Sequence, residues 1–418
     1  MWSDRLYMRH AKLVTSPSIL AAVALILFGA LAVPGSAAQL TVGSQGQFAT
    51  IQSAVEAAQP GDTIFIAPGT YVENVWVNKP LTITAASTRP TVQAADLSKD
   101  VFNVTSSGVR IEGLNIVGGA SGVEIRGVSK CVISNIVARD SQRAVYLAYS
   151  NNNAVTGSNL AGNGYGVYSD YSFGNTISAN NATSERGAGN ALGDGIYFNH
   201  GGSNTVTNNI LSANHVYGIS LYHSTQNVIS NNTISDNEYI GVRLGEASNN
   251  NTLTFNTISG NPQLGVMILS ATGNQIYLND FISQPVAVGG ASAAILNSPE
   301  KMVYAYGGVG RTGFMSNYYS DYKGADSNGS GIGTTPSIYG DKYPLVQPFA
   351  NYGNIIRASA VTPTPSPQRS ETASPPAYAP LSGVNVLLVA GVLGVASLIA
   401  AAVIYAILKR RKLQYAQK

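Results

Sequence analysis

Three short, evenly spaced segments in the middle of the chain decide the fold: Gly195-Ile196-Tyr197-Phe198, Gly218-Ile219-Ser220-Leu221 and Gly241-Val242-Arg243-Leu244. Each begins with glycine and carries apolar residues at its second and fourth positions. The segments start 23 residues apart. This alternation of apolar and other positions is typical of a β-strand with one buried face.

The same pattern repeats through the surrounding chain, in steps of 22, 22, 29, 23, 23 and 24 residues. Its starts are Gly122, Ala144, Gly166, Gly195, Gly218, Gly241 and Gly265. Two further short strands follow in each repeat, as in Asn227-Val228-Ile229 and Asn232-Thr233-Ile234. Three short strands cannot enclose a core alone, but they can when coils stack on one another. We therefore expect an all-β fold, a parallel β-helix of about ten coils.

Asparagine is abundant in these repeats, with 25 of the 129 residues from 151 to 279. Asparagine suits turns that need a positive φ. Stacked asparagine side chains can also hydrogen-bond from coil to coil, at the ~4.8 Å spacing of neighbouring strands. The periodic apolar positions argue against an asparagine-rich disordered chain.

Charge is sparse and unevenly placed. The net charge of +3 comes from 24 basic and 21 acidic residues. Residues 1–38 contribute +2, residues 381–418 contribute +5, and residues 39–380 contribute −4. This balance argues against a nucleic-acid partner, which needs basic clusters on the folded part. A nearly uncharged surface suits neutral, hydrogen-bonding partners such as sugars.

The two ends indicate export and anchoring. Residues 1–38 have the order of a signal peptide, although an uncleaved anchor is an alternative. Residues 384–408 form a 25-residue run without charge, long enough to span a membrane, and the basic tail 409–418 follows. Basic residues favour the cytoplasmic side. We expect a single-pass cell-surface protein with a cytoplasmic C-terminus, whose Pro/Thr/Ser-rich residues 351–383 form a stalk.

Two segments carry a family resemblance. The opening Phe48-Ala49-Thr50-Ile51-Gln52-Ser53-Ala54-Val55, with helical spacing, and the closing Ser316-Asn317-Tyr318-Tyr319 resemble NosD-type, pectin-lyase-like β-helix proteins. The resemblance implies a right-handed parallel β-helix over 39–350, with a capping helix at its start and a closing segment at 300–350. The family is named for a periplasmic copper-binding protein, and it includes surface proteins of methanogenic archaea. Its repeats also occur in polysaccharide lyases and hydrolases.

One outward column lies two positions after each repeat start: Glu124, Tyr146, Tyr168, Tyr197, Ser220, Arg243 and Met267. Three tyrosines in line predict a flat aromatic strip that stacks on sugar rings. We therefore predict carbohydrate binding by Tyr146, Tyr168, Tyr197 and Arg243. The alternative is a tyrosine ladder that only stabilises an exposed sheet.

A second column, five positions after each start, holds Tyr149, Tyr171, His200, His223, Glu246 and Ser270. His200, His223 and Glu246 are candidate acid–base catalysts, and His200 with His223 is a candidate copper or zinc site. A polar turn column without chemistry is the alternative. The 29-residue step predicts an insertion at 183–194 that overhangs this column. Asp326-x-Asn328-x-Ser330-Gly331 faintly resembles a calcium loop.

Together these features predict a membrane-anchored cell-surface protein that binds or displays carbohydrate. The expected partner is a polysaccharide or glycoprotein of the cell envelope. Two alternatives stay open. One is a polysaccharide lyase or hydrolase that acts on uronate-type glycans, and the other is a copper-binding NosD-like protein. The resemblance is unspecific about activity.

Overall fold

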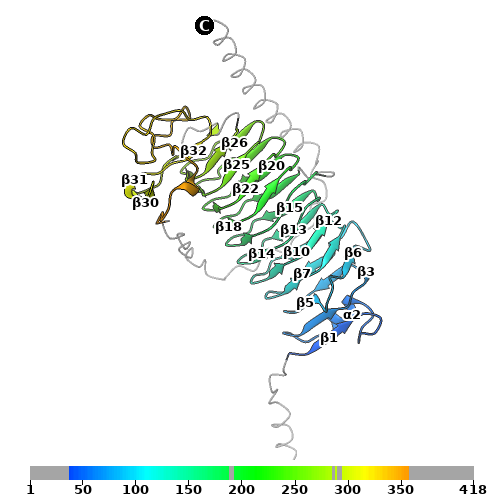
Figure 1. Ribbon diagram of the computed structural model, residues 1–418. Coiled ribbons are helices and arrows are strands. Elements are labelled where there is room, and N and C mark those ends of the chain that lie inside the picture. The colour runs from blue at the N-terminus through cyan, green and yellow to red at the C-terminus, as the bar shows by residue number, and fades with distance from the viewer. Residues whose placement is uncertain (1–36, 188–192, 285–287, 290–293, 357–418) are drawn as a thin grey trace, which may run out of the picture. The chain divides into compact units, whose positions relative to one another are not determined.

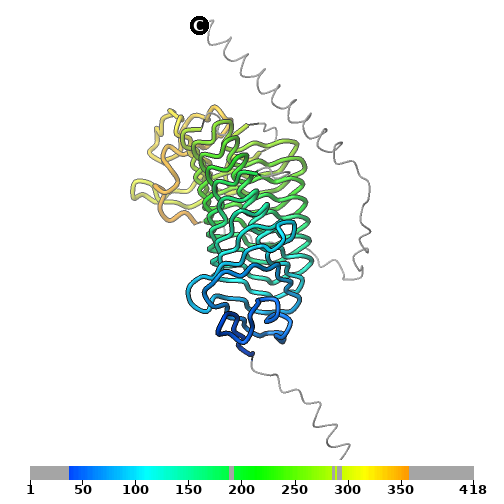
Figure 2. The backbone as a smooth tube through the Cα atoms, turned by 90° about the vertical axis from the view of Figure 1, so that its right-hand side faces the viewer, coloured from blue at the N-terminus to red at the C-terminus, as the bar shows by residue number. Residues whose placement is uncertain are grey.

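A computed structural model describes residues 37–187, 193–284, 288–289 and 294–356. This part of the chain winds into stacked coils (Figures 1 and 2). The predicted signal peptide up to residue 36, the stalk beyond 356, the apolar run 384–408 and the tail 409–418 lie outside the described residues and stay predictions. Within the described ranges, no helix combines the length and apolarity that crossing a membrane requires.

Three parallel sheets run the length of the described coil. Sheet A contains, in ladder order, β1 (Gln39–Val42), β2 (Thr63–Ile66), β5 (Thr82–Ala85), β8 (Arg110–Glu112), β11 (Val132–Ser134), β14 (Ala154–Thr156), β16 (Thr176–Ser178), β18 (Thr205–Thr207), β21 (Val228–Ser230), β24 (Thr252–Thr254) and β27 (Gln275–Tyr277). Sheet C contains β4 (Val75–Val77), β7 (Phe102–Val104), β10 (Ser121–Arg126), β13 (Arg143–Ala148), β15 (Tyr165–Asp170), β17 (Asp194–Asn199), β20 (Tyr217–Tyr222), β23 (Ile240–Leu244), β26 (Leu264–Ile268) and β29 (Val288–Gly289).

Sheet B has two parts, which single bridges through Asn159 and Asn181 connect. The first part is β3 (Thr70–Val72), β6 (Thr91–Gln93), β9 (Asn115–Val117) and β12 (Val137–Arg139), and the second is β19 (Ile210–Ser212), β22 (Thr233–Ser235), β25 (Thr257–Ser259), β28 (Asp280–Ile282) and β32 (Tyr318–Tyr319). The remaining elements are helix α2 (Ile51–Ala57), the antiparallel hairpin β30 (Met302–Tyr306) and β31 (Val309–Gly313), and the 3₁₀ turn η1 (Phe349–Asn351).

The register confirms the repeat that the sequence predicts. Val145 pairs with Val167, and Val167 with Ile196, all in parallel. The 29-residue step therefore keeps the register between β15 and β17. Sheet A has 11 strands and sheet C has 10, which confirms a parallel β-helix close to the expected size. Its handedness, taken from the family resemblance, stays a prediction.

Inward-facing aliphatic side chains fill the coil. Val145, Val167 and Ile196 are each at most 1% exposed, as are their counterparts on sheets A and B. Burial of one such side chain contributes roughly 1.5–3 kcal/mol. No single coil can bury these residues on both sides, so the hydrophobic core requires stacking.

Asparagine ladders fix the turns between the sheets, as the composition predicts. The backbone N–H and Nδ2 of Asn204 both donate to Oδ1 of Asn227, at 3.0 and 3.1 Å. The first ladder is Asn153, Asn175, Asn204, Asn227, Asn251 and Asn274, and the second is Asn180, Asn209, Asn232, Asn256, Asn279 and Asn317. Their members are buried, so each bond satisfies groups that water cannot reach.

Both ends of the coil are covered. Helix α2 buries Ile51, Ala54 and Val55 at the first coil, which confirms the predicted capping helix. The carboxylate of Glu73 accepts the N–H groups of Ile51 and Gln52, at 2.9 and 3.0 Å, where a helix start favours negative charge. At the other end, Tyr319 is 1% exposed, and its ring stacks on Phe281 of the preceding coil.

A third ladder contains one carboxylate among its asparagines. Glu185 lies between Asn163 and Asn214. Its Oε2 accepts the backbone N–H of Asn163 at 2.5 Å, and its own N–H donates to Oδ1 of Asn214 at 3.0 Å. The side chain is fully buried, and Oε1 has no hydrogen-bond partner among the described residues. Burial therefore raises the pKa of Glu185 well above its usual value.

We expect Asn209→Ala to destabilise the coil by about 2–4 kcal/mol, because the backbone N–H of Asn180 and the carbonyl of Ile177 would lose buried partners. Urea denaturation followed by circular dichroism measures the change. The matched control is Asn208→Gly, at the exposed neighbouring position, where glycine keeps the positive φ of 57°. Equal midpoints for both variants would contradict the ladder's role.

We expect Glu185→Gln to raise the melting temperature at neutral and alkaline pH. Because the pKa of Glu185 is higher in the folded than in the unfolded chain, the native protein loses stability as pH rises from the ordinary glutamate pKa to the raised one, and a neutral glutamine removes this loss. Thermal denaturation across pH measures the difference. The difference in melting temperature between Glu185→Gln and the wild type should vanish in acid, where the wild-type carboxyl is protonated in both the folded and the unfolded chain. A variant that is less stable at every pH would contradict a protonated Glu185.

Candidate functional site

The outward face of sheet C carries the predicted tyrosine column. Tyr146 pairs with Tyr168, and Tyr168 with Tyr197, in direct register on β13, β15 and β17. The pairing continues through Ser220 to Arg243. The structure therefore brings the predicted carbohydrate-binding residues into one column.

The tyrosine rings in this column tilt against one another and do not form a flat strip. The Tyr146 and Tyr168 rings meet edge to face, with centroids 5.3 Å apart and planes at 80°. Tyr168 and Tyr197 lie 5.0 Å apart at 55°, and Tyr165 contacts both of these rings. Burial raises the pKa of Tyr146 to about 12, and the pKa values of Tyr168 and Tyr197 further. These phenols stay neutral hydrogen-bonding groups at physiological pH.

Residues just before the repeat starts complete this cluster, and they lie outside the two columns that the repeat predicts. Arg143 lies over the rings of Tyr146 and Tyr168, with Cζ 4.6 and 5.4 Å from their centroids. Arg243 lies 5.9 Å from the ring of Tyr217. The signal that could have found them is the shared offset of Arg143, Tyr165 and Tyr217, one position before each start.

The second column forms a stack of parallel rings, which we call the ring ladder: Tyr149, Tyr171, His200 and His223. Successive centroids lie 5.3, 4.7 and 4.8 Å apart, and the planes differ by at most 7°. All four residues have a positive φ, between 46° and 52°, which is uncommon outside glycine. Tyr149 and Tyr171 are 47% and 44% exposed. The ladder is an aromatic edge that spans four coils, exposed at the two tyrosines and half-buried at the two histidines.

Glu246 does not share this column, contrary to the expected spacing. The N–H of His200 donates to the carbonyl of Tyr222, the residue before His223. The N–H of His223 donates to the carbonyl of Glu246, so the equivalent ladder position is Ala247, which also has a positive φ. One additional residue in this turn shifts Glu246 back by one position, toward the neighbouring column.

That neighbouring column is polar and consists of Asp170, Asn199, Tyr222 and Glu246; we call it the polar column. Asn199 donates to Asp170 at 2.8 Å, and the Tyr222 hydroxyl donates to Glu246 at 3.5 Å. Nδ1 of His200 lies 2.9 Å from Oδ1 of Asn199. Burial lowers the pKa of His200, with a contribution from His223, and burial raises the pKa of Asp170. The imidazole of His200 is therefore neutral near pH 7.

On its N-terminal side, the tyrosine column continues from Tyr146 to the carboxyl group of Glu124. Glu124 pairs with Tyr146 across the strands, and its carboxyl group contacts the guanidinium of Arg126. Burial, together with a hydrogen bond to Asp100 and the charge of Asp100, raises the pKa of Glu124 to about 8, although Arg126 acts in the opposite direction. This carboxyl therefore holds a proton near neutral pH, so Glu124 adds no full negative charge to the tyrosine cluster.

The inserted segment enters at the other end of the strand from the histidines. Its described ends are Gly187 and Gly193, and β17 begins at Asp194. His200 follows the last residue of β17, six residues or about 20 Å further on. The expected overhang of the ring ladder therefore has no support from the described residues.

The two histidines do not converge on a shared metal position. A metal binds imidazole nitrogen in the plane of the ring, about 2.0–2.1 Å away. The His200 and His223 planes differ by only 2° at a centroid distance of 4.8 Å, so they have no common point near both nitrogens. Among the described residues, no group of three or more histidine, cysteine, aspartate or glutamate side chains could hold a metal ion. These residues do not fit a copper site in this arrangement.

The calcium-like loop is closed by its own backbone. Asp326 accepts the N–H of Ser330 at 2.8 Å and that of Gly331 at 2.7 Å, one on each carboxylate oxygen. Asn328 also accepts the N–H of Ser330, at 3.1 Å. Both carboxylate oxygens of Asp326 therefore accept backbone hydrogen bonds, which is the geometry of an aspartate-stabilised turn.

A family model described as periplasmic copper-binding protein (NosD) matches residues 55–192 and 188–324. The chain belongs to the NosD family. A cell surface glycoprotein of Methanothermus fervidus is 30% identical over 113 residues, which are 27% of this chain and 19% of that protein. The chain thus spans about a fifth of this relative's length.

Solved structures also resemble this NosD-family chain. An alginate lyase from Paenibacillus is 17% identical, with a TM-score of 0.48 over 62% of this chain and 97% of that one. The pectate lyase Pel9A is 17% identical, with a TM-score of 0.47 over 62% of this chain and 78% of that one.

We expect the single substitutions His200→Asn and His223→Asn each to change Cu²⁺ affinity less than twofold, because the parallel rings offer no shared position. Asparagine is chosen since it tolerates the positive φ of both residues. Isothermal titration calorimetry of the full-length protein measures the affinity. Loss of the same binding event in both variants would contradict this geometry.

Proposed function

We propose that this NosD-family protein is displayed at the cell surface and binds a neutral carbohydrate chain along the outward face of sheet C. The observation that carries the proposal is the ring ladder beside the polar column. Both columns present the same kinds of group on successive coils, about 4.8 Å apart. A linear polymer that lies along the coil axis would therefore meet repeated hydrogen-bonding groups.

The ring ladder would contact a glycan through edges and polar atoms. The ring faces inside the ladder cover one another at 4.7–5.3 Å, so they leave little room for a stacked sugar. Phenol hydroxyls and imidazole nitrogens stay at the edge of each ring, and such groups hydrogen-bond well with hydroxyl-rich ligands. Asp170 and Asn199 add acceptors and donors beside them.

The tyrosine cluster belongs to the same proposed face. Tyr146, Tyr168 and Tyr197 each precede a ring-ladder residue by three positions on the same coil. Arg143 packs over two of these rings, so the cluster can hold the face rigid and offer its hydroxyls. Arg243 extends the face toward β23.

The proposal of surface display is supported by the two ends of the sequence and by the proteins that this chain is similar to. Residues 1–38 have the pattern of an export signal, and residues 384–408 have the length and apolarity of a membrane anchor. The matched family model is described as periplasmic, and one matched relative is a cell surface glycoprotein. We therefore place the coil outside the cell, anchored by one C-terminal segment.

We expect the full-length protein in detergent to bind at least one neutral envelope polysaccharide on a glycan array. Tyr171→Asn should weaken this binding at least tenfold, about 1.4 kcal/mol, because it interrupts the ring ladder. The matched control is Tyr239→Ala, a tyrosine of similar exposure (43% against 44%) that precedes β23.

Four outcomes are decisive for this proposal. No binding by the wild-type protein, or equal binding by Tyr171→Asn and wild type, would overturn it. An equal loss of polysaccharide binding in Tyr171→Asn and Tyr239→Ala would also contradict binding at the face of sheet C. Release of unsaturated sugar ends from uronate polymers by the wild type would favour the lyase alternative, with the Tyr222–Glu246 pair beside His223 as its centre.

A further inference from the structure

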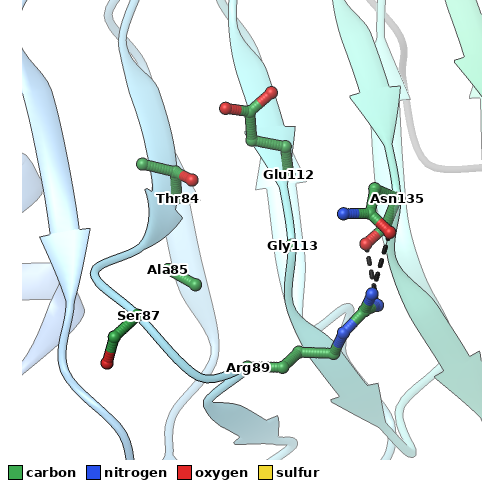
Figure 3. A pocket seen from close by; sticks show the side chains of 7 residues that line it. All are labelled: Thr84, Ala85, Ser87, Arg89, Glu112, Gly113 and Asn135. Atoms are coloured by element: carbon green, nitrogen blue, oxygen red, sulfur yellow. Dashed lines mark hydrogen bonds between the residues drawn. The ribbon is translucent and has the colours of Figure 1, made fainter.

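A polar hollow of about 410 Å³ lies on sheet A, among the first coils (Figure 3). Its lining residues are Thr84, Ala85, Ser87, Arg89, Glu112, Gly113 and Asn135. Small-ligand pockets span roughly 300–1,000 Å³, so the hollow is of sufficient size for a small molecule. Neither column of the proposed glycan face contributes to it.

The hollow exists because one turn is long and its floor residues are small. Five residues, 86–90, connect β5 to β6, whereas two residues connect β8 to β9 and β11 to β12. Ala85 and Gly113 form the floor, and Figure 3 shows the polar side chains arranged around them. A Cβ at Gly113 would meet Ala85 at 3.6 Å, so there is room for a side chain that the sequence omits.

Arg89 fixes the long turn in place and forms one wall. Its guanidinium donates to the backbone carbonyl of Asn135 at 2.7 Å and to its side-chain oxygen at 2.8 Å. These residues are 46 positions apart in sequence, and Arg89 crosses the Gly113 turn to reach Asn135 (Figure 3). Two bonds to one residue restrict the planar guanidinium strongly. The wall is therefore held in position without a ligand.

The lining of the hollow combines one acidic side chain, one basic side chain and hydroxyl groups. Glu112 supplies a carboxylate, which lies 3.4 Å from the guanidinium of Arg110. Thr84 and Ser87 supply hydroxyls that can donate and accept. Glu112 disfavours an anionic ligand, and Arg89 disfavours a cationic one. A neutral ligand with several hydroxyls can use all of these groups.

We propose that this hollow binds one neutral sugar unit, as a second site separate from the face of sheet C. Glu112 accepts from sugar hydroxyls, Thr84 and Ser87 exchange hydrogen bonds with them, and Arg89 closes the side. Ala85 and Gly113 leave space for the ring of the sugar. The site is independent of the ring ladder, because its strands belong to sheet A.

The test fills the hollow without disturbing the turn. Gly113 has a φ of +70°, and Asn135 occupies the equivalent turn position one coil later, with a φ of +50°. Gly113→Asn therefore suits the backbone and places a side chain in the hollow. The matched control is Gly157→Asn, at the same turn position beyond Asn135, with a φ of +59° and nothing within 4 Å of its Cβ.

Saturation-transfer difference NMR on the full-length protein, with D-glucose, D-galactose and N-acetyl-D-glucosamine as probes, gives the readout. We expect a signal for at least one probe in the wild type and in Gly157→Asn, and a decrease of at least fivefold in Gly113→Asn. D-glucuronate and D-glucosamine should give weaker signals than the neutral sugar. No signal for any probe, equal signals in both asparagine variants, or stronger signals for the charged sugars would overturn the proposal.

The two proposed sites can fail separately. Tyr171→Asn should keep the NMR signal of the monosaccharide that binds in the hollow. The same variant should lose binding to the polysaccharide on the glycan array. Gly113→Asn should lose the monosaccharide signal and keep polysaccharide binding. If Tyr171→Asn abolishes the monosaccharide signal, those sugars bind at sheet C and the hollow is not their site.

Discussion

The structure depends on one repeated hydrogen bond, from the backbone N–H of a turn residue to the side-chain oxygen of the asparagine one coil later. Asn175 donates in this way to Asn204, and Asn204 to Asn227, at 2.8 and 3.0 Å. The turns could not be buried without such partners, because unpaired N–H groups would each cost about 1–3 kcal/mol. The ladders also fix the register, since a slipped coil would lose the partner at every turn.

The arrangement of the proposed glycan face follows from that register. Once β13, β15, β17 and β20 are aligned, every residue at a given offset lies directly beside its counterpart, and rings at the same turn position must stack. Tyr171, His200 and His223 thereby form one continuous edge. The same register places the two histidine rings one coil apart and keeps their planes parallel. For this reason the rings suit a ligand with repeating units better than a single metal ion bound by both.

Much of the fold could be predicted from the sequence, because glycine starts, apolar alternation and turn asparagines recur at fixed offsets. The offsets also predicted the tyrosine column and the stacking of His200 beside His223. They failed at Glu246, where one additional residue in a single turn shifts the column by one position. They could not show ring tilt, since Tyr146 and Tyr168 share an offset but take different orientations. The Gly113 hollow depends on a long turn that lies before the regular repeats.

The most direct test of the account is hydrogen–deuterium exchange at the turn amides of Asn180, Asn204 and Asn209, read by mass spectrometry on overlapping peptides. Each of these N–H groups donates to an asparagine side chain one coil later, at 2.9–3.0 Å. The account predicts protection equal to that of the neighbouring strand β18. Exchange as fast as in exposed turns would contradict the claim that buried asparagine ladders fix the register.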